Sequence, residues 1–558
     1  MVDRVTVEVV RHAAIAAAEE MGVVLRNASM SPNIRDRLDF SCAVLSPEGE
    51  LVAQAEHIPV HLGSMPVGAR AVLGELERLG VEPGPGDVVV SNDPYLTGTH
   101  INDVMMLAPV HAGGRLAAYV ACKAHYVDVG GCVPGGIGPG ARSLRDEGLV
   151  VPPVKLVEAG RVRWDVLRLL EANVREPGRV RGDAMAQLAA LRRGAERIRE
   201  LAGRYGTGTL LEAWREILGY TERYTRSVLA RLVEEHGGGV YEAEDGLETA
   251  SGRLLRIRAR LEVTRSRVRV DFSGTSPQVE EPLNAVYGVT VAATTYALKT
   301  VLDPDMPMNS GFYRVAEIHA PEGTLVNPRP PAPVGGGNVE TSQRIADVVL
   351  RALAEAFPGR VPAASCGTMS NLILAGRGWV FYETIGCGAG ARPCCDGVDG
   401  VQTNMTNTLN TPVEVAEAEY PLRFRRYELR PGSGGPGRWR GGLGVVRAIT
   451  VLEDGVVATV YAERSRTRPW GLEGGGPGAP FRALLVRGSG ERLELASKTT
   501  LVLSRGDTIY IETPGGGGYG DPCARPRELV ERDLAEGRIS LEEARKHYCY
   551  EDQGGGGS

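Results

Sequence analysis

The sequence is poor in several features that would assign it to a class at once. None of its nine cysteines forms a C-x-x-C pair, so neither a zinc ribbon nor a disulfide framework is indicated, and we expect the adjacent Cys394 and Cys395 to be reduced thiols. No stretch approaches the roughly 18 apolar residues that a membrane-spanning helix needs. The charged first residues are unlike a signal peptide. We therefore expect a cytoplasmic protein with no membrane partner.

Two further absences limit the function classes. No G-K dipeptide occurs, which excludes a Walker A phosphate loop, and no G-x-S-x-G elbow occurs, which argues against a serine hydrolase. The net charge of -6 gives no reason to expect nucleic acid as a partner. Only five of the 63 basic residues are lysines, a bias of composition that assigns no function.

The length and composition are those of a globular protein with several packed regions. The chain has 558 residues, of which 43% are hydrophobic and 24% charged, and this length is too great for one ordinary core. We expect an α+β chain without the regular βαβ alternation of a Rossmann sheet. Its predicted regions are a mixed α/β metal-site region (1–162), a helical segment (163–236), an α+β region (240–424), a glycine-rich β region (425–524), a helical tail (525–552) and an added glycine-serine linker (553–558).

Periodicity predicts the main elements. Apolar residues at helical spacing predict helices over 3–26, 65–80, 286–302 and 340–357, and several more within 163–236. The text FSCAVLS-PEGE-LVAQA predicts a β-hairpin, and GDVVVSNDP and RLAAYVACKAHYVDVGG predict strands that each run into a polar loop. The glycine runs at 335–338, 432–437 and 514–522 favour turns and close backbone contacts, although 335–337 leaves an anion-binding helix N-terminus open.

Residues that could bind a metal or take part in chemistry are most concentrated between positions 91 and 132. His100 and Asp103 are three residues apart, so a tight turn can present both to one ion, and hairpin pairing can bring His125 beside them. Two imidazoles and one carboxylate with open positions suit Zn²⁺, Mn²⁺ or Fe²⁺. Such an ion lowers the pKa of bound water to roughly 7 on zinc, which makes hydroxide available. Spacing alone leaves the alternative that these histidines are structural.

A second polar cluster precedes this one. His57 and His61 are four residues apart, but Pro59 between them argues against a helix interior. The favoured interpretation is a loop whose histidines hydrogen-bond the backbone; the alternative is the lining of a substrate pocket. Asp39 is either a turn residue at a strand start, a fourth metal ligand, or a carboxylate that orients a histidine.

At these residues the sequence resembles a known family. The segments SPNIRDRLDFSCAVLSPEGELVAQAEHIPVHLGSM, GDVVVSNDPYLTGTHINDVMML, AHYVDVGG, GGGNVETSQRIADVVLRAL, DGVQTNMTNTLNTPVE and RYELRPGSGGPGRWRGGLG resemble the hydantoinase B/oxoprolinase family from about residue 3 to 524. The resemblance implies a metal set of Asp39, His100, Asp103 and His125, holding zinc or manganese. It also implies an ATP-binding hydantoinase A-like partner, in a hetero-oligomer such as α2β2.

The resemblance implies a hydrolytic subunit that opens cyclic amides in an ATP-dependent complex. On this view Asp128 and His57 are candidate catalytic groups, Asp128 equally a turn cap, and His61 and Asn404 candidate substrate contacts. The family usually has proline at the position of Asn102 and often histidine at those of Gln402 and Asn404, which puts substrate contacts around 400–406 in doubt. Two rivals stay open: a subunit of an ATP-dependent ketone carboxylase, whose counterparts tend to be longer, and a non-catalytic scaffold.

Overall fold

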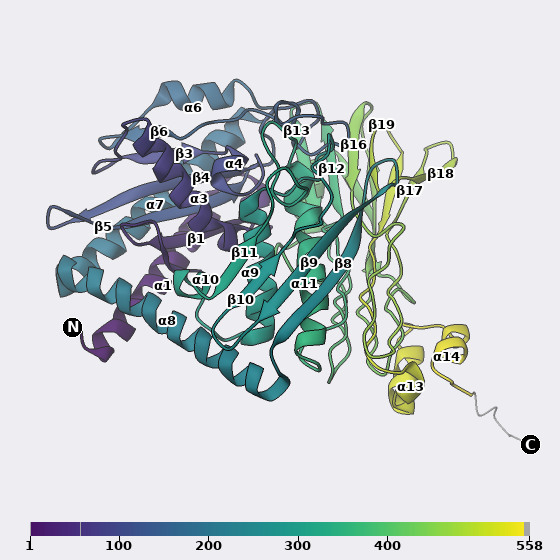
Figure 1. Ribbon diagram of the computed structural model, residues 1–558. Helices are drawn as coiled ribbons and strands as arrows, with labels where there is room; N and C mark the ends of the chain where they lie inside the picture. The colour runs from purple at the N-terminus through teal and green to yellow at the C-terminus, as the bar shows by residue number, and fades with distance from the viewer. Residues whose placement is uncertain (1, 56, 552–558) are drawn as a thin grey trace, which may run out of the picture.

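A computed structural model describes residues 2–55 and 57–551 (Figure 1). The expected α+β class is confirmed: within these residues helices pack against four sheets. The predicted linker at 553–558 lies outside the described residues. No helix in the described part of the chain combines the length and apolar character needed to cross a membrane.

The first sheet organises the N-terminal region and is antiparallel throughout. Its strands in spatial order are β2 (Leu51–Gln54), β1 (Phe40–Leu45), β5 (Arg115–His125), β4 (Asp103–Ala112), β3 (Val88–Ser91), β6 (Val154–Glu158) and β7 (Arg161–Val162). The predicted hairpin at β1–β2 and the predicted strands β3 and β5 are confirmed. Strand β4, whose first residue is a predicted metal ligand, was not recognised in the sequence.

Helices cover both faces of this sheet. The predicted N-terminal helix α1 (Arg4–Ala28) packs with α7 (Pro177–Tyr205) on one face, and α3 (Pro59–Arg78) packs on the other. The shorter helices of this half are α2 (Pro32–Arg35), α4 (Pro94–Thr97), α5 (Leu144–Glu147) and α6 (Trp164–Glu171), and α8 (Thr207–His236) runs beneath the sheet in Figure 1. The prediction of several helices within 163–236 is confirmed.

Side-chain alternation along β4 and β5 decides which residues face which helices. Met106 and Cys122 lie in the core shared with α1 and α7, whereas Met105 and Ala121 lie in the core shared with α3. Successive side chains of a strand point to opposite faces. Asp103 has the parity of Met105, so its side chain points toward α3.

The second half of the chain begins with a sheet of β11 (Ala316–His319), β10 (Val268–Asp271), β9 (Leu254–Val263) and β8 (Gly239–Glu248). It packs against the two helices predicted in this region, α9 (Tyr287–Leu302) and α11 (Ser342–Ala356), the latter preceded by a π-helical turn η1 (Gly337–Thr341). The short helix α10 (Ser310–Tyr313) follows α9. Residues of α1, α7, β9, α9 and α11 share one apolar core.

Two further sheets, built from strands within residues 371–512, pack on each other around a separate core. One contains β13 (Trp379–Thr384), β12 (Asn371–Gly376), β16 (Val456–Tyr461) and β19 (Lys498–Leu503). The other contains β14 (Leu422–Leu429), β15 (Val445–Val451), β20 (Thr508–Glu512), β17 (Arg482–Val486) and β18 (Arg492–Leu495). The remaining helices are α12 (Val413–Glu419), η2 (Pro522–Ala524), α13 (Arg527–Ala535) and α14 (Leu541–His547), and the last two form the expected tail near the C-terminus in Figure 1.

The glycine runs of this half make close backbone contacts, as expected. A Cβ added to Gly516 would lie 1.9 Å from the carbonyl oxygen of Ala389, and one on Gly441 would lie 2.0 Å from that of Gly516. Backbone hydrogen bonds join the same segments, including Gly435 N to Gly516 O at 2.8 Å. Glycine is required here because a side chain would separate segments that pack at backbone contact.

The cysteines correct the sequence analysis. Two disulfides are present, Cys366–Cys387 and Cys523–Cys549, where the spacing gave no indication of any. Each joins segments that only the tertiary fold brings together, 21 and 26 residues apart in the chain. Cys394 and Cys395 are free, as expected.

Candidate metal centre

The centre is built at the shared end of the β4–β5 hairpin. Asp103 is the first residue of β4 and His125 the last of β5, and the two are directly paired across the strands. His100 precedes them in a turn closed by a hydrogen bond from Asp103 N to His100 O at 3.1 Å. The tight turn and the hairpin pairing expected from the sequence are therefore confirmed.

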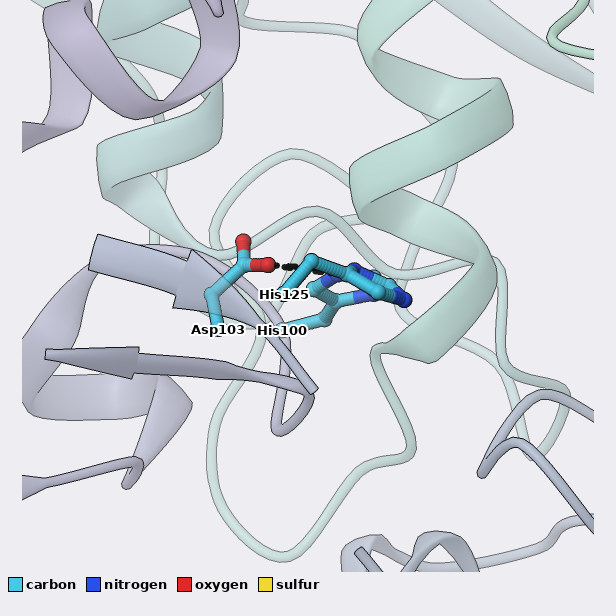
Figure 2. A group of neighbouring side chains, drawn as sticks. All are labelled: His100, Asp103 and His125. Atoms are coloured by element: carbon cyan, nitrogen blue, oxygen red, sulfur yellow. Dashed lines mark hydrogen bonds and ion pairs between the residues drawn. The ribbon is translucent and has the colours of Figure 1, made fainter. Parts of the chain in front are cut away.

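The three side chains converge on one point (Figure 2). His100 Nε2 lies 3.1 Å from Asp103 Oδ1 and 3.1 Å from His125 Nδ1, and His125 Nδ1 lies 3.3 Å from Asp103 Oδ1. In a tetrahedral site with bonds of about 2.0–2.1 Å, neighbouring ligand atoms are separated by roughly 3.3 Å. The triangle thus has the dimensions that one divalent ion requires, and the three residues fit a metal site.

The surroundings of these atoms suit the binding of a metal ion. All three side chains are buried. His100 Nδ1 lies 3.2 Å from the carbonyl oxygen of Gly335, which can accept only if that nitrogen carries the proton, and this leaves Nε2 free to bind metal. Burial alone would raise the pKa of Asp103, but the neighbouring His100 and His61 oppose this effect and hold the pKa well below its usual value. The carboxylate is therefore ionised.

His61 belongs to this centre, and the prediction that it lies in a loop is wrong. Pro59 is the first residue of α3, a position that tolerates proline because its backbone nitrogen needs no helical partner. His61 consequently lies in the first turn of α3, on the sheet face to which Asp103 points. Its Nε2 lies 3.1 Å from Asp103 Oδ2, the oxygen on the far side of the carboxylate from His100.

Asp39 lies at the edge of the same group. Its side chain lines a cavity with His61, His100 and His125, and its backbone oxygen accepts a hydrogen bond of 3.0 Å from His125 N. Arg37 Nη2 is 3.7 Å from Asp39 Oδ2. The group of ligand atoms that lie within 4.8 Å of one another contains His100, Asp103 and His125 but not Asp39, so the position favours a carboxylate beside the histidines over a fourth ligand.

His57 is placed differently from His61. Its Nδ1 accepts a hydrogen bond of 3.3 Å from Cys42 N, and its ring packs edge-on against Phe40 and closely against Gly22 of α1. Burial, with a contribution from His61, lowers the pKa of His57 to about 4. The geometry corresponds to the backbone-bonded histidine that the sequence analysis favoured.

Asp128 and Asn404 make structural contacts. The Asp128 carboxylate accepts hydrogen bonds from Gly130 N at 3.3 Å, Gly135 N at 3.2 Å, and Arg175 N and Nη1 at 2.8 Å each. Asn404 Nδ2 donates to Asp347 Oδ1 at 3.2 Å. Neither side chain lines the cavity beside the candidate metal centre, so the structure does not bring them together with the three convergent ligands.

The helix start at residues 335–337 is not a free anion-binding site. Gly335 N donates to Glu147 Oε1 at 2.7 Å, so a buried carboxyl group already occupies the start of this helix. Burial raises the pKa of Glu147 to about 8, and the hydrogen bonds from Gly335 and Val334 oppose that shift only in part. Because Gly335 also accepts from His100, Glu147 helps to fix the peptide that orients this histidine.

The cavity beside the ligands has a volume of about 20 Å³, enough for about one water molecule. Its remaining wall contains residues that the sequence analysis did not select: Asn338, Tyr382, Thr384, Thr406 and Thr408. The ring of Tyr382 packs 4.8 Å from that of His125. These residues come from η1, β13 and the loop before α12, which only the fold brings to the hairpin.

The family model described as Hydantoinase B/oxoprolinase matches residues 3–522. An uncharacterised protein of Methanocaldococcus jannaschii is 49% identical over 98% of this chain and 96% of its own length. A 5-oxoprolinase of Arabidopsis thaliana is 37% identical over 93% of this chain, which spans only 42% of that relative. The crystal structure of an ATP-dependent caprolactamase from Pseudomonas jessenii superposes with a TM-score of 0.93 at 31% identity, covering 100% of this chain and 98% of that one.

Proposed function

The chain belongs to the hydantoinase B/oxoprolinase family, and from that membership we propose that it is the metal-dependent hydrolytic subunit of an ATP-dependent ring-opening amidohydrolase. The observation that carries the proposal is the buried convergence of His100 Nε2, Asp103 Oδ1 and His125 Nδ1 within 3.1–3.3 Å of one another. The names of two similar proteins, a 5-oxoprolinase and an ATP-dependent caprolactamase, support a cyclic amide as the substrate class.

ATP is bound by a separate partner in this proposal. The chain has no Walker A loop, and Glu147 occupies the helix start that the sequence left open for an anion. The Arabidopsis 5-oxoprolinase extends well beyond the 42% of its length that this chain spans. A hydantoinase A-like ATPase subunit, in a hetero-oligomer such as α2β2, supplies the corresponding function to this chain.

The division of labour follows from the reactivity of amides. An unactivated amide is a poor electrophile, so the partner transfers the γ-phosphoryl group of ATP to the carbonyl oxygen of the ring. Water then attacks the ring carbon, the C–N bond breaks, and hydrolysis of the remaining acyl phosphate releases the amino acid and inorganic phosphate. The net reaction consumes one ring, one ATP and two waters.

Each side chain of the centre has an assigned role. His100, Asp103 and His125 would hold a zinc or manganese ion, and such an ion would supply water with a pKa lowered toward neutrality. His61 contacts the second oxygen of Asp103 and fixes the orientation of that carboxylate. Asp39 adds negative charge at the edge of the site, where it raises the pKa of His125 against the lowering effect of burial.

The experiment is a turnover assay of the chain reconstituted with its ATPase partner. A panel of lactams and hydantoins with ATP is compared with a ketone plus bicarbonate and ATP. The proposal predicts ATP-dependent ring opening and no carboxylation. Carboxylation of the ketone alone would replace it with the carboxylase alternative, and the absence of stoichiometric metal from purified protein would favour the scaffold.

A further inference from the structure

Three threonine hydroxyls form a continuous group on the cavity wall. Thr384 Oγ1 lies 2.7 Å from Thr408 Oγ1, and Thr408 Oγ1 lies 3.4 Å from Thr406 Oγ1. All three side chains line the cavity that His61, His100 and His125 also line, and all three are buried. Thr384 belongs to β13, whereas the other two precede α12.

A buried arginine sets the direction of the hydrogen bonds. Arg37, which is 0% exposed, donates from Nη2 to Thr384 Oγ1 at 2.8 Å and from Nη1 to Tyr382 O at 3.0 Å. A guanidinium has no acceptor and stays protonated, so Thr384 Oγ1 must accept this bond. The proton of the Thr384 hydroxyl has one acceptor within reach among the described residues, which is Thr408 Oγ1.

The last hydroxyl in this series of hydrogen bonds is therefore a donor. A hydroxyl has a single proton. When Thr408 accepts from Thr384, its own proton points either along the long contact to Thr406 or into the cavity. In both cases a hydroxyl proton, polarised by the charge on Arg37, is presented to the space beside the metal ligands. The buried amide of Asn338, whose Oδ1 has no partner in the described part of the chain, lies on the same wall.

We infer that the Arg37–Thr384–Thr408–Thr406 relay recognises one oxygen atom of an oxyanion, because the cavity between this wall and the metal ligands admits about one water-sized group. Its donor end favours an acceptor oxygen carrying negative charge, and Arg37, which also lies 3.7 Å from Asp39 Oδ2, polarises the relay through its hydrogen bond to Thr384. The inference rests on the proposed function for the source of the oxyanion, which is either a phosphoryl group originating from ATP or a carboxylate of the substrate or product. Both present the same chemistry to Thr408.

The test measures binding of small anions to the full-length, metal-loaded chain without a partner. Calorimetric titration with inorganic phosphate represents the phosphoryl source, formate the carboxylate source, and formamide a neutral control. Thr408→Val removes the hydroxyl and keeps the shape of the side chain, whereas Thr408→Ser keeps the hydroxyl. We expect an anion to bind the unchanged protein, at least tenfold weaker binding to Thr408→Val, and near-normal binding to Thr408→Ser, with the metal content equal in all three.

The chain provides a matched control. Arg425 Nε donates to Thr450 Oγ1 at 3.0 Å, and Thr450 Oγ1 lies 2.7 Å from Thr508 Oγ1. This reproduces the arginine–threonine–threonine arrangement on β14, β15 and β20, outside the cavity lining. Thr508→Val should leave anion binding unchanged.

Binding of phosphate alone identifies the phosphoryl source, and binding of formate alone identifies the carboxylate. If neither anion binds more tightly than formamide, or if Thr408→Val binds as tightly as the unchanged protein, the inference is wrong. The anion titration does not involve lactam turnover. A failed titration would therefore not contradict the proposed function, and an absence of lactam turnover would not contradict the anion site.

Discussion

Asp103 and His125 are directly opposite each other in the β4–β5 register, and His125 Nδ1 lies 3.3 Å from Asp103 Oδ1. Their side chains share a strand face because paired residues of an antiparallel ladder point the same way. The hairpin therefore fixes two of the three candidate ligands by backbone pairing alone. Its turn adds the third, and α3 brings His61 to the same carboxylate.

His61 and His57 make a matched pair of substitutions. His61→Ala should lower metal affinity about 10- to 100-fold, because it removes the group that orients Asp103. His57→Ala should leave metal affinity unchanged, because this ring bonds Cys42 N and packs on Phe40. Metal titration against a competing chelator measures both affinities. Equal losses in the two variants would contradict the separate roles given to these histidines.

The lowered pKa of His57 should also make the stability of the protein depend on pH. Its folded pKa of about 4 lies below the ordinary value of 6.5, so the unfolded chain takes up a proton first as the pH falls. The contribution of the neutral His57 ring to the free energy of unfolding is fully present above about pH 6.5 and is lost progressively toward pH 4. It amounts to at most about 3 kcal/mol. Denaturant unfolding of the unchanged protein and His57→Asn between pH 4 and 7 measures it. The variant should lose less stability over this window, and identical slopes would contradict the account.

Glu147 should support His100 from a distance. Glu147→Ala leaves the buried Gly335 N without its acceptor, which should cost about 1–3 kcal/mol of stability and weaken metal binding through Gly335. Glu147→Gln keeps an acceptor oxygen. Because the folded pKa of about 8 lies above the ordinary 4.5, stability is lost as the pH rises through this range, and the glutamine variant should be free of that loss. Melting temperatures between pH 6 and 9 and metal titrations distinguish the two variants. If Glu147→Gln lost stability with rising pH as the unchanged protein does, Glu147 would not be the group that causes the loss.

A substitution of Asp128 distinguishes a structural role of this carboxylate from a catalytic one. Asp128→Asn should lower stability by about 2–3 kcal/mol, because it weakens the contact with Arg175 and presents an amide where four donors now converge. Turnover per folded molecule should change little. A variant of unchanged stability that loses most of its turnover would restore Asp128 as a candidate catalytic group.

The sequence predicts the parts of the site that depend on local pattern. The H-x-x-D turn and the strand ending in His125 are readable because a turn and a hairpin involve neighbours in the chain. The sequence predicts a loop at His61 because proline breaks a helix interior, whereas in the structure Pro59 is the first residue of α3. Thr384 and Thr408 carry no local signal, since their role depends on Arg37, more than 340 residues away along the chain. The two disulfides were missed for the same reason.

The most direct test of the central claim is metal content and turnover measured together on His100→Ala and Asp103→Asn. Each is purified, analysed for bound metal by mass spectrometry, and assayed with the ATPase partner on the best lactam substrate, with Thr508→Val as the control. The account predicts loss of stoichiometric metal, at least about 100-fold lower kcat/KM for both variants, and an unchanged control. A His100→Ala protein that keeps its metal and its full turnover would contradict the account.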